Sequence, residues 1–269
     1  MSTLAGLNWM LVPTLILALL LFFAGRGWVR RARGAGAKVA LLLAGWVAAS
    51  PGLIYAFYYE LEFQDWKGFL ELRTLRGSEI LAAGMGLLAG ALAGLPPKRS
   101  PILSGLLVAA LMLLVAVPYG KQLFWPLQMD RSLGAWTGEV CRQSTGSTCG
   151  PACVATLLKR FGINATEEEL ARECHTTAGG TENWYMARVL RSHGLHVEYR
   201  ILPAPPTSLP IPSIAGVRVG GSGHVVTVLG QTDKLYLIGE PFTGRREISK
   251  KDVFIKYQFT GFFLVVSKE

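Results

Sequence analysis

Three polar residues in the C-terminal half have the types and order of a thiol nucleophile and its helpers. Cys149 begins the stretch Cys-Gly-Pro-Ala-Cys, Gln143 lies six residues before it, and His224 lies 75 residues after it in Gly-His-Val-Val. A cysteine activated by a histidine can attack a carbonyl carbon, and a side-chain amide can donate to the oxyanion that forms. The three residues therefore predict nucleophilic catalysis by a thiol.

The position of Cys149 at the start of a predicted helix supports this chemistry. Pro151 is typical of a first helical turn, and apolar residues follow it at helical spacing until Gly162. Unpaired backbone N–H groups and the helix dipole stabilise a thiolate at such a position. The alternative is a buried cysteine that acts as a small apolar side chain.

Residues 141–269 have the pattern of one α+β domain, with helices first and an antiparallel sheet second. Thr166 with Glu169 three residues later predicts a capping box for a short helix that ends near Cys174. The predicted helices are 149–161, 166–174 and 182–193. The predicted strands are 195–202, 211–219, 224–229, 234–238 and 259–266, separated by Pro, Gly and Asp turns.

The motifs of this region resemble one known family. Gln-x5-Cys-Gly-x-Ala-Cys, Gly180-Thr181, Gly-His224-Val-Val and Glu240-Pro-x-x-Gly-Arg are similar to those of papain-like peptidases that remove double-glycine leader peptides from bacteriocins. The resemblance covers about residues 140–266. It implies a papain-like fold, Cys149 as nucleophile, His224 as general base and acid, Gln143 as oxyanion donor and Glu240 as the residue that orients the imidazole. It implies no cofactor.

The sequence departs from the family at two positions and lacks one associated motif. Thr148 and Glu240 stand where the family usually has aspartate, and the second change lengthens the orienting side chain by one methylene. Relatives are commonly fused to an ATP-driven exporter, but no G-x-x-x-x-G-K-[ST] loop occurs here. The resemblance therefore implies a separate exporter as a partner. A leader-binding domain that does not cut, and a thiol acyltransferase, remain as alternative functions.

The remaining cysteines and histidines favour simpler roles. Cys153 lies one helical turn after Cys149, where core packing is expected. No pair has the spacing of a strong zinc site, so no metal is predicted. Cys141 and Cys174 would form a disulfide only in an oxidising compartment, and the sequence leaves this open. The other three histidines, which are expected to be solvated, are His175, His193 and His196.

The N-terminal half is too apolar for an ordinary soluble domain. Four apolar runs without charge occur in residues 1–119, and about 20 such residues cross a bilayer core. The predicted spans are 7–24, 39–58, 80–95 and 101–119, the third being short. Gly86, Gly90 and Gly94 form a stripe of small residues on the third run, which fits close helix packing within the bundle or in an oligomer.

The charges of the loops between these runs predict the orientation in the membrane. The first and third loops carry seven Lys and Arg residues together, whereas the second carries three. Basic loops stay in the cytoplasm. We therefore expect a multi-pass protein of the bacterial inner membrane whose C-terminal domain is extracytoplasmic.

The overall charge indicates lipid contact and no nucleic-acid contact. The net charge is +9, but no basic run is interleaved with aromatic residues. Residues 120–140 are predicted to be a juxtamembrane linker, which would keep the domain near a peptide or protein substrate at the bilayer. The sequence therefore predicts a membrane-anchored cysteine endopeptidase.

Overall fold

The computed structural model describes residues 7–58, 60–61, 65–95, 101–129 and 135–268. The chain divides into two compact units. Asn8–Gln64 and Arg76–Lys121 form one unit, and Gln122–Glu269 forms the other together with Asp65–Leu75 and the first seven residues. A short segment from the predicted second loop therefore belongs to the same unit as the C-terminal domain.

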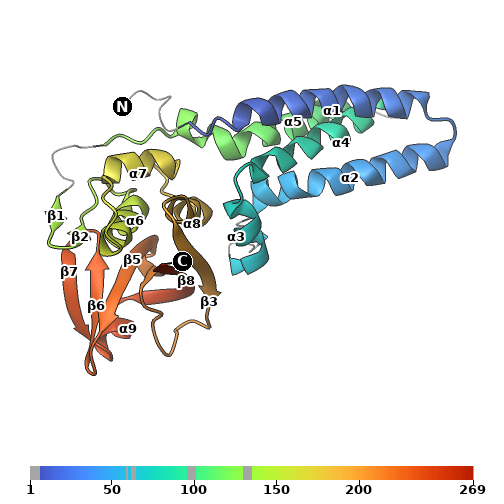
Figure 1. Ribbon diagram of the computed structural model, residues 1–269. Helices are drawn as coiled ribbons and strands as arrows, with labels where there is room; N and C mark the ends of the chain where they lie inside the picture. Colours follow the sequence, from blue (N-terminus) through green and yellow to red (C-terminus); the bar gives the residue numbers. More distant parts are fainter. Residues whose placement is uncertain (1–6, 59, 62–64, 96–100, 130–134, 269) are drawn as a thin grey trace. The chain divides into compact units, whose positions relative to one another are not determined.

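The first unit consists of apolar helices. Its elements are α1 (Leu11–Arg31), α2 (Ala35–Phe57), the 3-10 helix η2 (Ser78–Ala83), α4 (Gly84–Gly94) and most of α5 (Pro101–Phe124), drawn from blue to green in Figure 1. Two of the described helices, α1 and α2, are long and apolar enough to span a membrane, and the bent pair α3 and η2–α4 would make a third if it counts as one span. The predicted count of four spans is not confirmed.

Glycines explain how α4 packs against α1. A methyl group added at Gly86 would overlap the carbonyl oxygen of Ala18, and one at Gly90 would overlap that of Phe22. Both backbones therefore approach closely because neither glycine has a side chain. The small-residue stripe is a contact within the bundle.

The C-terminal domain, residues 135–268, has helices first and a sheet second, which confirms the α+β prediction. The helices are α6 (Cys149–Arg160), α7 (Glu167–Glu173) and α8 (Asn183–Ser192), and α6 and α8 pack against the sheet. The expected capping box of α7 is present, with Thr166 and Glu169 each bonded to the other's backbone. Figure 1 shows these helices beside the strands.

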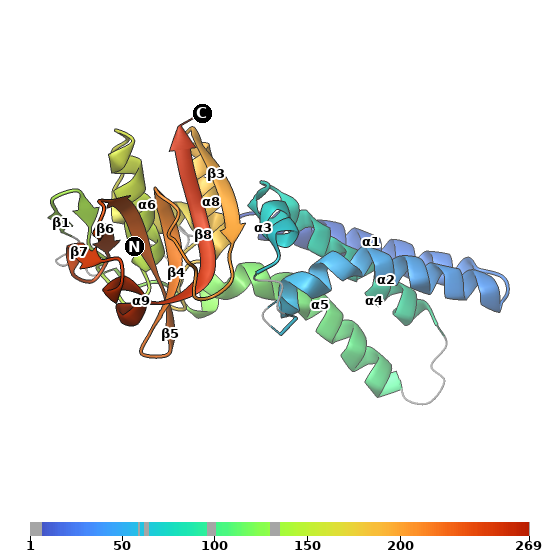
Figure 2. The same ribbon diagram turned by 90° about the horizontal axis from the view of Figure 1, so that it is seen from below.

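The sheet is antiparallel, with strand order β3-β8-β4-β5-β6-β7. The strands are β3 (Leu195–Ile201), β4 (Ser213–Val219), β5 (Ser222–Gln231), β6 (Leu235–Glu240), β7 (Gly244–Ser249) and β8 (Gln258–Lys268). Five of them match the predicted strands. Figure 2 shows the long neighbours β3, β8, β4 and β5 from below.

Several elements were not expected from the sequence. They are α3 (Lys67–Thr74), β7, α9 (Asp252–Lys256) and a hairpin of β1 (Trp136–Thr137) and β2 (Val140–Cys141). Within the stretch predicted as a linker, α5 continues to Phe124 and the hairpin begins at Trp136. Residues 130–134 lie outside the described residues.

Candidate active site

Cys149 is the first residue of α6, as predicted, and its side chain is partly exposed. The preceding turn is fixed by hydrogen bonds within it and to Glu167 of α7. The N–H of Thr145 donates to Thr148 Oγ1 at 3.1 Å, and the N–H of Ser144 donates to Glu167 Oε1 at 2.9 Å. The first N–H groups of a helix have no intrahelical acceptor. The thiol therefore lies at a helix end whose donors are open to an anion.

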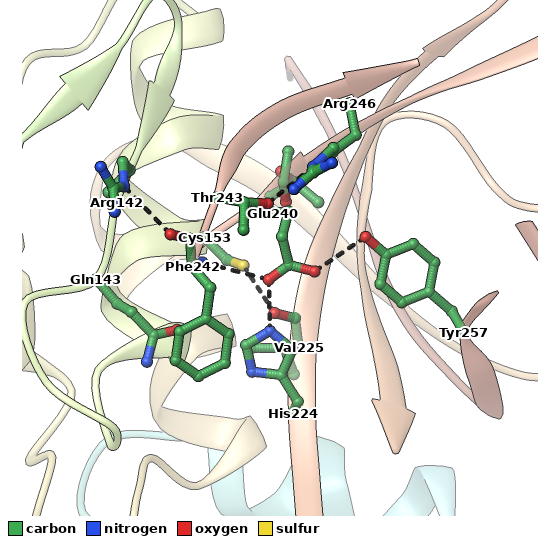
Figure 3. A network of polar contacts seen from close by, with 12 residues as sticks. Arg142, Gln143, Cys153, His224, Val225, Glu240, Phe242, Thr243, Arg246 and Tyr257 are labelled. Atoms are coloured by element: carbon green, nitrogen blue, oxygen red, sulfur yellow. Dashed lines mark hydrogen bonds and ion pairs between the residues drawn. The ribbon is translucent and has the colours of Figure 1, made fainter. Parts of the chain in front are cut away.

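His224 lies on β5, next to the strand that carries Glu240. β5 pairs with β6, with Thr227 opposite Gly239, and this register brings the two side chains together across the sheet. His224 Nε2 lies 2.8 Å from Glu240 Oε1, and both side chains are buried. Figure 3 shows the pair at the centre of the polar network. The structure thus brings together the histidine and the carboxylate that the sequence predicted.

The Cys149 side chain completes this group of residues. Burial alone would lower the pKa of His224, but hydrogen bonds with the Cys149 side chain and with Glu240 raise that pKa to about 9. Because Nε2 is bonded to Glu240, Nδ1 is the ring nitrogen that remains for the thiol. A histidine whose pKa is raised beside a cysteine is suited to take up a proton from the thiol.

Glu240 is held by two further donors. The N–H of Phe242 donates to Oε1 at 3.3 Å, and the hydroxyl of Tyr257 donates to Oε2 at 3.0 Å. Burial would raise the pKa of Glu240, but the hydrogen bonds from His224, Phe242 and Tyr257 lower that pKa below its usual value. The carboxylate therefore stays ionised although it is buried.

Phe242 and Tyr257 were missed by the sequence analysis. The ring of Phe242 stacks on the imidazole of His224, with centroids 5.0 Å apart and planes at 22°. Phe242 lies two residues after Glu240 in the Glu-Pro-x-x-Gly motif, so the motif itself contained a signal. Tyr257 follows the unpredicted helix α9, 17 residues after Glu240, and no sequence pattern indicates it.

Gln143 lies in the loop before α6, six residues before Cys149, and its side chain is buried. Its backbone N–H donates to Pro241 O at 2.9 Å, which ties the nucleophile loop to the residue after Glu240. Its side-chain Nε2 donates to Thr145 O at 2.5 Å. An amide nitrogen carries two hydrogens, and this bond uses one of them.

The other three cysteines differ from Cys149 in their surroundings. All three are free and buried. The disulfide between Cys141 and Cys174 that the sequence left open is therefore not formed in the structure. Burial raises the pKa of Cys141 to about 12 and raises those of Cys153 and Cys174 strongly. Cys153 Sγ lies 3.5 Å from Val225 O, inside the packed region, as expected from its place on α6.

In the part of the chain that the structure describes, no group of three or more His, Cys, Asp or Glu side chains lies together in a way that could hold a metal ion. Among the polar atoms near Cys149, Gln143 Oε1 is buried and has no hydrogen-bond partner in the described residues. The arrangement brings a cysteine at a helix start, a buried His–Glu pair and a buried glutamine into one region of the domain.

Comparisons with known proteins place residues 138–269 in the Peptidase C39 family. An uncharacterised protein from Methanothermobacter marburgensis is 36% identical over 130 residues, which cover 48% of this chain and 89% of the relative. A protein of Pseudomonas fluorescens named as a probable functional amyloid protease is 26% identical over 160 residues, 56% of this chain and 70% of that relative.

Among solved structures, a double glycine motif protease from an AMS/PCAT transporter, crystallised in complex with its leader peptide, is similar to the C-terminal domain. The two are 22% identical, with a TM-score of 0.43 over 53% of this chain and 99% of the other.

Proposed function

The chain belongs to the peptidase C39 family, and we propose that it is a membrane-anchored cysteine endopeptidase that cuts an exported peptide or protein segment through a cysteinyl acyl-enzyme. The observation that carries this proposal is the buried His224–Glu240 pair at 2.8 Å, with the Cys149 side chain at the start of α6 among the groups that raise the pKa of His224. Family membership supports a cysteine peptidase, and the further details below are our proposal.

In the first half-reaction, His224 holds the thiol proton and the Cys149 sulfur attacks the scissile carbonyl carbon. The carbonyl oxygen becomes an oxyanion. The free N–H of the Gln143 side chain and the backbone N–H of Cys149 donate to it. The C–N bond then breaks, His224 gives its proton to the leaving amine, and a thioester remains on Cys149.

In the second half-reaction, water attacks the thioester. His224 takes a proton from the water, the oxyanion forms again at the same donors, and the carbon–sulfur bond breaks to release a carboxylic acid. Glu240 accepts a hydrogen bond from Nε2 throughout, which fixes the imidazole and stabilises its charged form. Phe242, stacked on the ring, restricts the imidazole to this plane.

The helices α1 and α2 support anchoring in a membrane, and the charge of the loops supports an extracytoplasmic domain. A tethered domain of this kind fits a substrate that crosses or leaves the bilayer, and a separate exporter would deliver it. The relative from Pseudomonas fluorescens is named as a probable functional amyloid protease. For this chain we propose an exported segment as the substrate class.

The same thioester also permits a second function. If an amine replaces water, the product is a conjugate and the enzyme is an acyltransferase. A third candidate binds peptide without cutting it. Mass spectrometry of the products separates the three outcomes as a cleaved peptide, a conjugate, or an unchanged peptide.

The test uses the purified full-length protein in detergent with a library of peptides that contain small-residue cleavage sites. We expect hydrolysis by the wild-type protein and none by Cys149→Ala. Iodoacetamide is expected to label Cys149 first, because the other three thiols are buried and have raised pKa values.

Cys153→Ala is the matched control, since it removes a cysteine from the same helix without touching the reacting atoms. It is expected to keep most of the activity. Full turnover by Cys149→Ala, or cysteine labelling that begins at another position, would end the assignment of the nucleophile.

A further inference from the structure

One helix of the C-terminal unit comes from a distant part of the sequence. α3 (Lys67–Thr74) follows the candidate membrane helix α2, yet it belongs to the same compact unit as the C-terminal domain. Phe69, Leu70, Arg73 and Thr74 are buried, although α3 has only eight residues. Such a short helix is not stable alone in water. Its burial must therefore come from contacts with the domain.

The first set of contacts is made by one face of α8. Trp184, Arg188 and Arg191 are spaced four and three residues apart and so share a face. The ring of Phe69 meets that of Trp184 edge to face, with centroids 5.8 Å apart. The guanidinium of Arg73 lies 4.9 Å from the same ring. Arg191 Nη2 donates to Glu71 Oε2 at 2.8 Å.

Arg188 makes the most specific of these contacts, because it caps the C-terminal end of α3. Its Nη2 donates to Arg73 O at 2.7 Å and to Leu75 O at 3.0 Å, and its Nε donates to Thr74 O at 3.1 Å. The last carbonyls of a helix lack intrahelical donors, and a positive charge is favourable there. The planar guanidinium suits several carbonyls at once, which a lysine cannot match.

β3 supplies a second set of contacts. Thr74 Oγ1 and the buried Tyr199 hydroxyl are 2.6 Å apart, and Lys67 Nζ lies 3.6 Å from Glu198 Oε1. Both ends of α3 therefore meet the domain with polar groups, and its middle meets it with an aromatic ring. This arrangement of polar contacts at both ends of the helix and an aromatic contact between them is specific for α3.

We propose that α3 is a docking element that fixes the C-terminal domain to the loop between α2 and η2. Loop and domain then share one face of the membrane. This inference goes beyond the proposed function and does not depend on peptidase activity.

Through α8, the docked helix α3 is also connected to α6, the helix that presents Cys149. The opposite face of α8 meets the start of α6, where a methyl group at Gly150 would come within 3.0 Å of Met186 Sδ. α8 is thus placed between α3 and the helix that presents Cys149. Loss of α3 is expected to loosen α8 first.

The first experiment tests the shared face. In full-length Cys149→Ser, whose other cysteines are buried, a single exposed cysteine is introduced as Arg76→Cys beside α3 or as Lys234→Cys in the domain. Intact cells are treated with a membrane-impermeant maleimide, and a cytoplasmic marker protein verifies that the reagent stays outside. We expect both variants to be labelled, or both to be protected until the cells are permeabilised. The inference is overturned if one variant is labelled in intact cells and the other is labelled only after permeabilisation.

The second experiment tests docking itself through Cys174, which is buried against α8, with its Sγ 3.9 Å from Tyr185 O. Peptide mapping by mass spectrometry follows the rate of its alkylation in the same Cys149→Ser background. Phe69→Ala removes the ring on Trp184, so we expect Cys174 to react about 100-fold faster. Arg188→Lys keeps the charge but loses the guanidinium hydrogen bonds to three carbonyls. We expect this variant to raise the alkylation rate of Cys174 about tenfold.

Leu72→Ala is the matched control on the same helix, because Leu72 is exposed. It is expected to leave the Cys174 rate within about twofold of the parent, as for a surface change. Docking is refuted if Phe69→Ala and Leu72→Ala behave alike, or if neither Phe69→Ala nor Arg188→Lys changes the rate. Both measurements use an inactive background, so a failure of the proposed catalysis would not affect them.

Discussion

The apolar helices and the active site are held together in opposite ways. α4 reaches α1 because Gly86 and Gly90 have no side chain to keep the two backbones apart. Glu240 is held at His224 because three side chains and one backbone N–H complete each other's hydrogen bonds. The contact between α1 and α4 does not tolerate a larger side chain at these glycines. The network around Glu240 does not tolerate the loss of a hydrogen-bonding group. Substitutions should therefore act by volume in one region and by polarity in the other.

The largest effect of lost polarity is expected at Glu240. Glu240→Ala leaves His224 without its acceptor, and kcat/KM should fall by about 10³–10⁴-fold. Glu240 also raises the pKa of His224. The wild-type rate should therefore fall above about pH 9, where the imidazolium loses its proton, and the variant should lose activity at a lower pH. A pH–rate profile measures both changes.

Glu240→Asp is the control, because it restores a carboxylate of the length usual in the family. It is expected to remain active. If Glu240→Ala cleaves at the wild-type rate from pH 6 to 8, another group orients His224.

Gln143→Ala should have the next largest effect. One oxyanion donor is worth about 10²–10³ in kcat, and KM should change little because the donor acts mainly in the transition state. Gln231→Ala, at an exposed position on β5, is the control and should be neutral. A change confined to KM would make Gln143 a substrate contact.

Added volume is tested at Gly90. Gly90→Ala places a methyl group against the carbonyl oxygen of Phe22, and overpacking of this kind costs about 1–3 kcal/mol. Gly105→Ala adds the same methyl where no atom lies within 4 Å and should cost nothing. Thermal unfolding of the protein in detergent measures the difference. If both variants are equally stable, the glycine contact between α1 and α4 does not hold the helices.

The smallest effect is expected from Tyr257→Phe, which keeps the ring and removes one hydrogen bond to Glu240. A bond of this kind contributes about 1 kcal/mol, so kcat/KM should fall roughly fivefold. If Tyr257 acts by positioning Glu240, the alkaline fall in activity should also move to lower pH. An unchanged pH profile would give Tyr257 a purely structural role.

Local signals in the sequence predicted most of the C-terminal domain. The capping box at Thr166, the Pro151 start of α6 and the alternation in five strands are set by neighbouring residues, so the elements could be placed without knowing their partners. The two donors to Glu240 could not be predicted in this way. Tyr257 reaches the carboxylate only because α9 and β8 bring it back to the end of β6, and that depends on the whole sheet.

The apolar half was predicted in composition but not in detail. Hydropathy marked four runs, yet the third begins as a 3-10 helix and continues as α4, with only 11 residues. α3 was assigned to a loop because its sequence, KGFLELRT, has no strong apolar period. Its helix depends on Arg188 and Trp184, more than 100 residues away, so no local pattern could indicate it.

The distance between α3 and its partners along the chain also orders the events of synthesis. Arg188 caps carbonyls that lie up to 115 residues earlier. At the usual rate of about 5–20 residues per second, the end of α3 is synthesised about 6–23 s before Arg188. During that interval Phe69 has no aromatic partner in the domain, and α3 is too short to persist as a helix. The C-terminal domain must therefore bind a segment that was synthesised much earlier. A nascent chain stalled before Arg188 should expose residues 67–74 to proteases and chaperones.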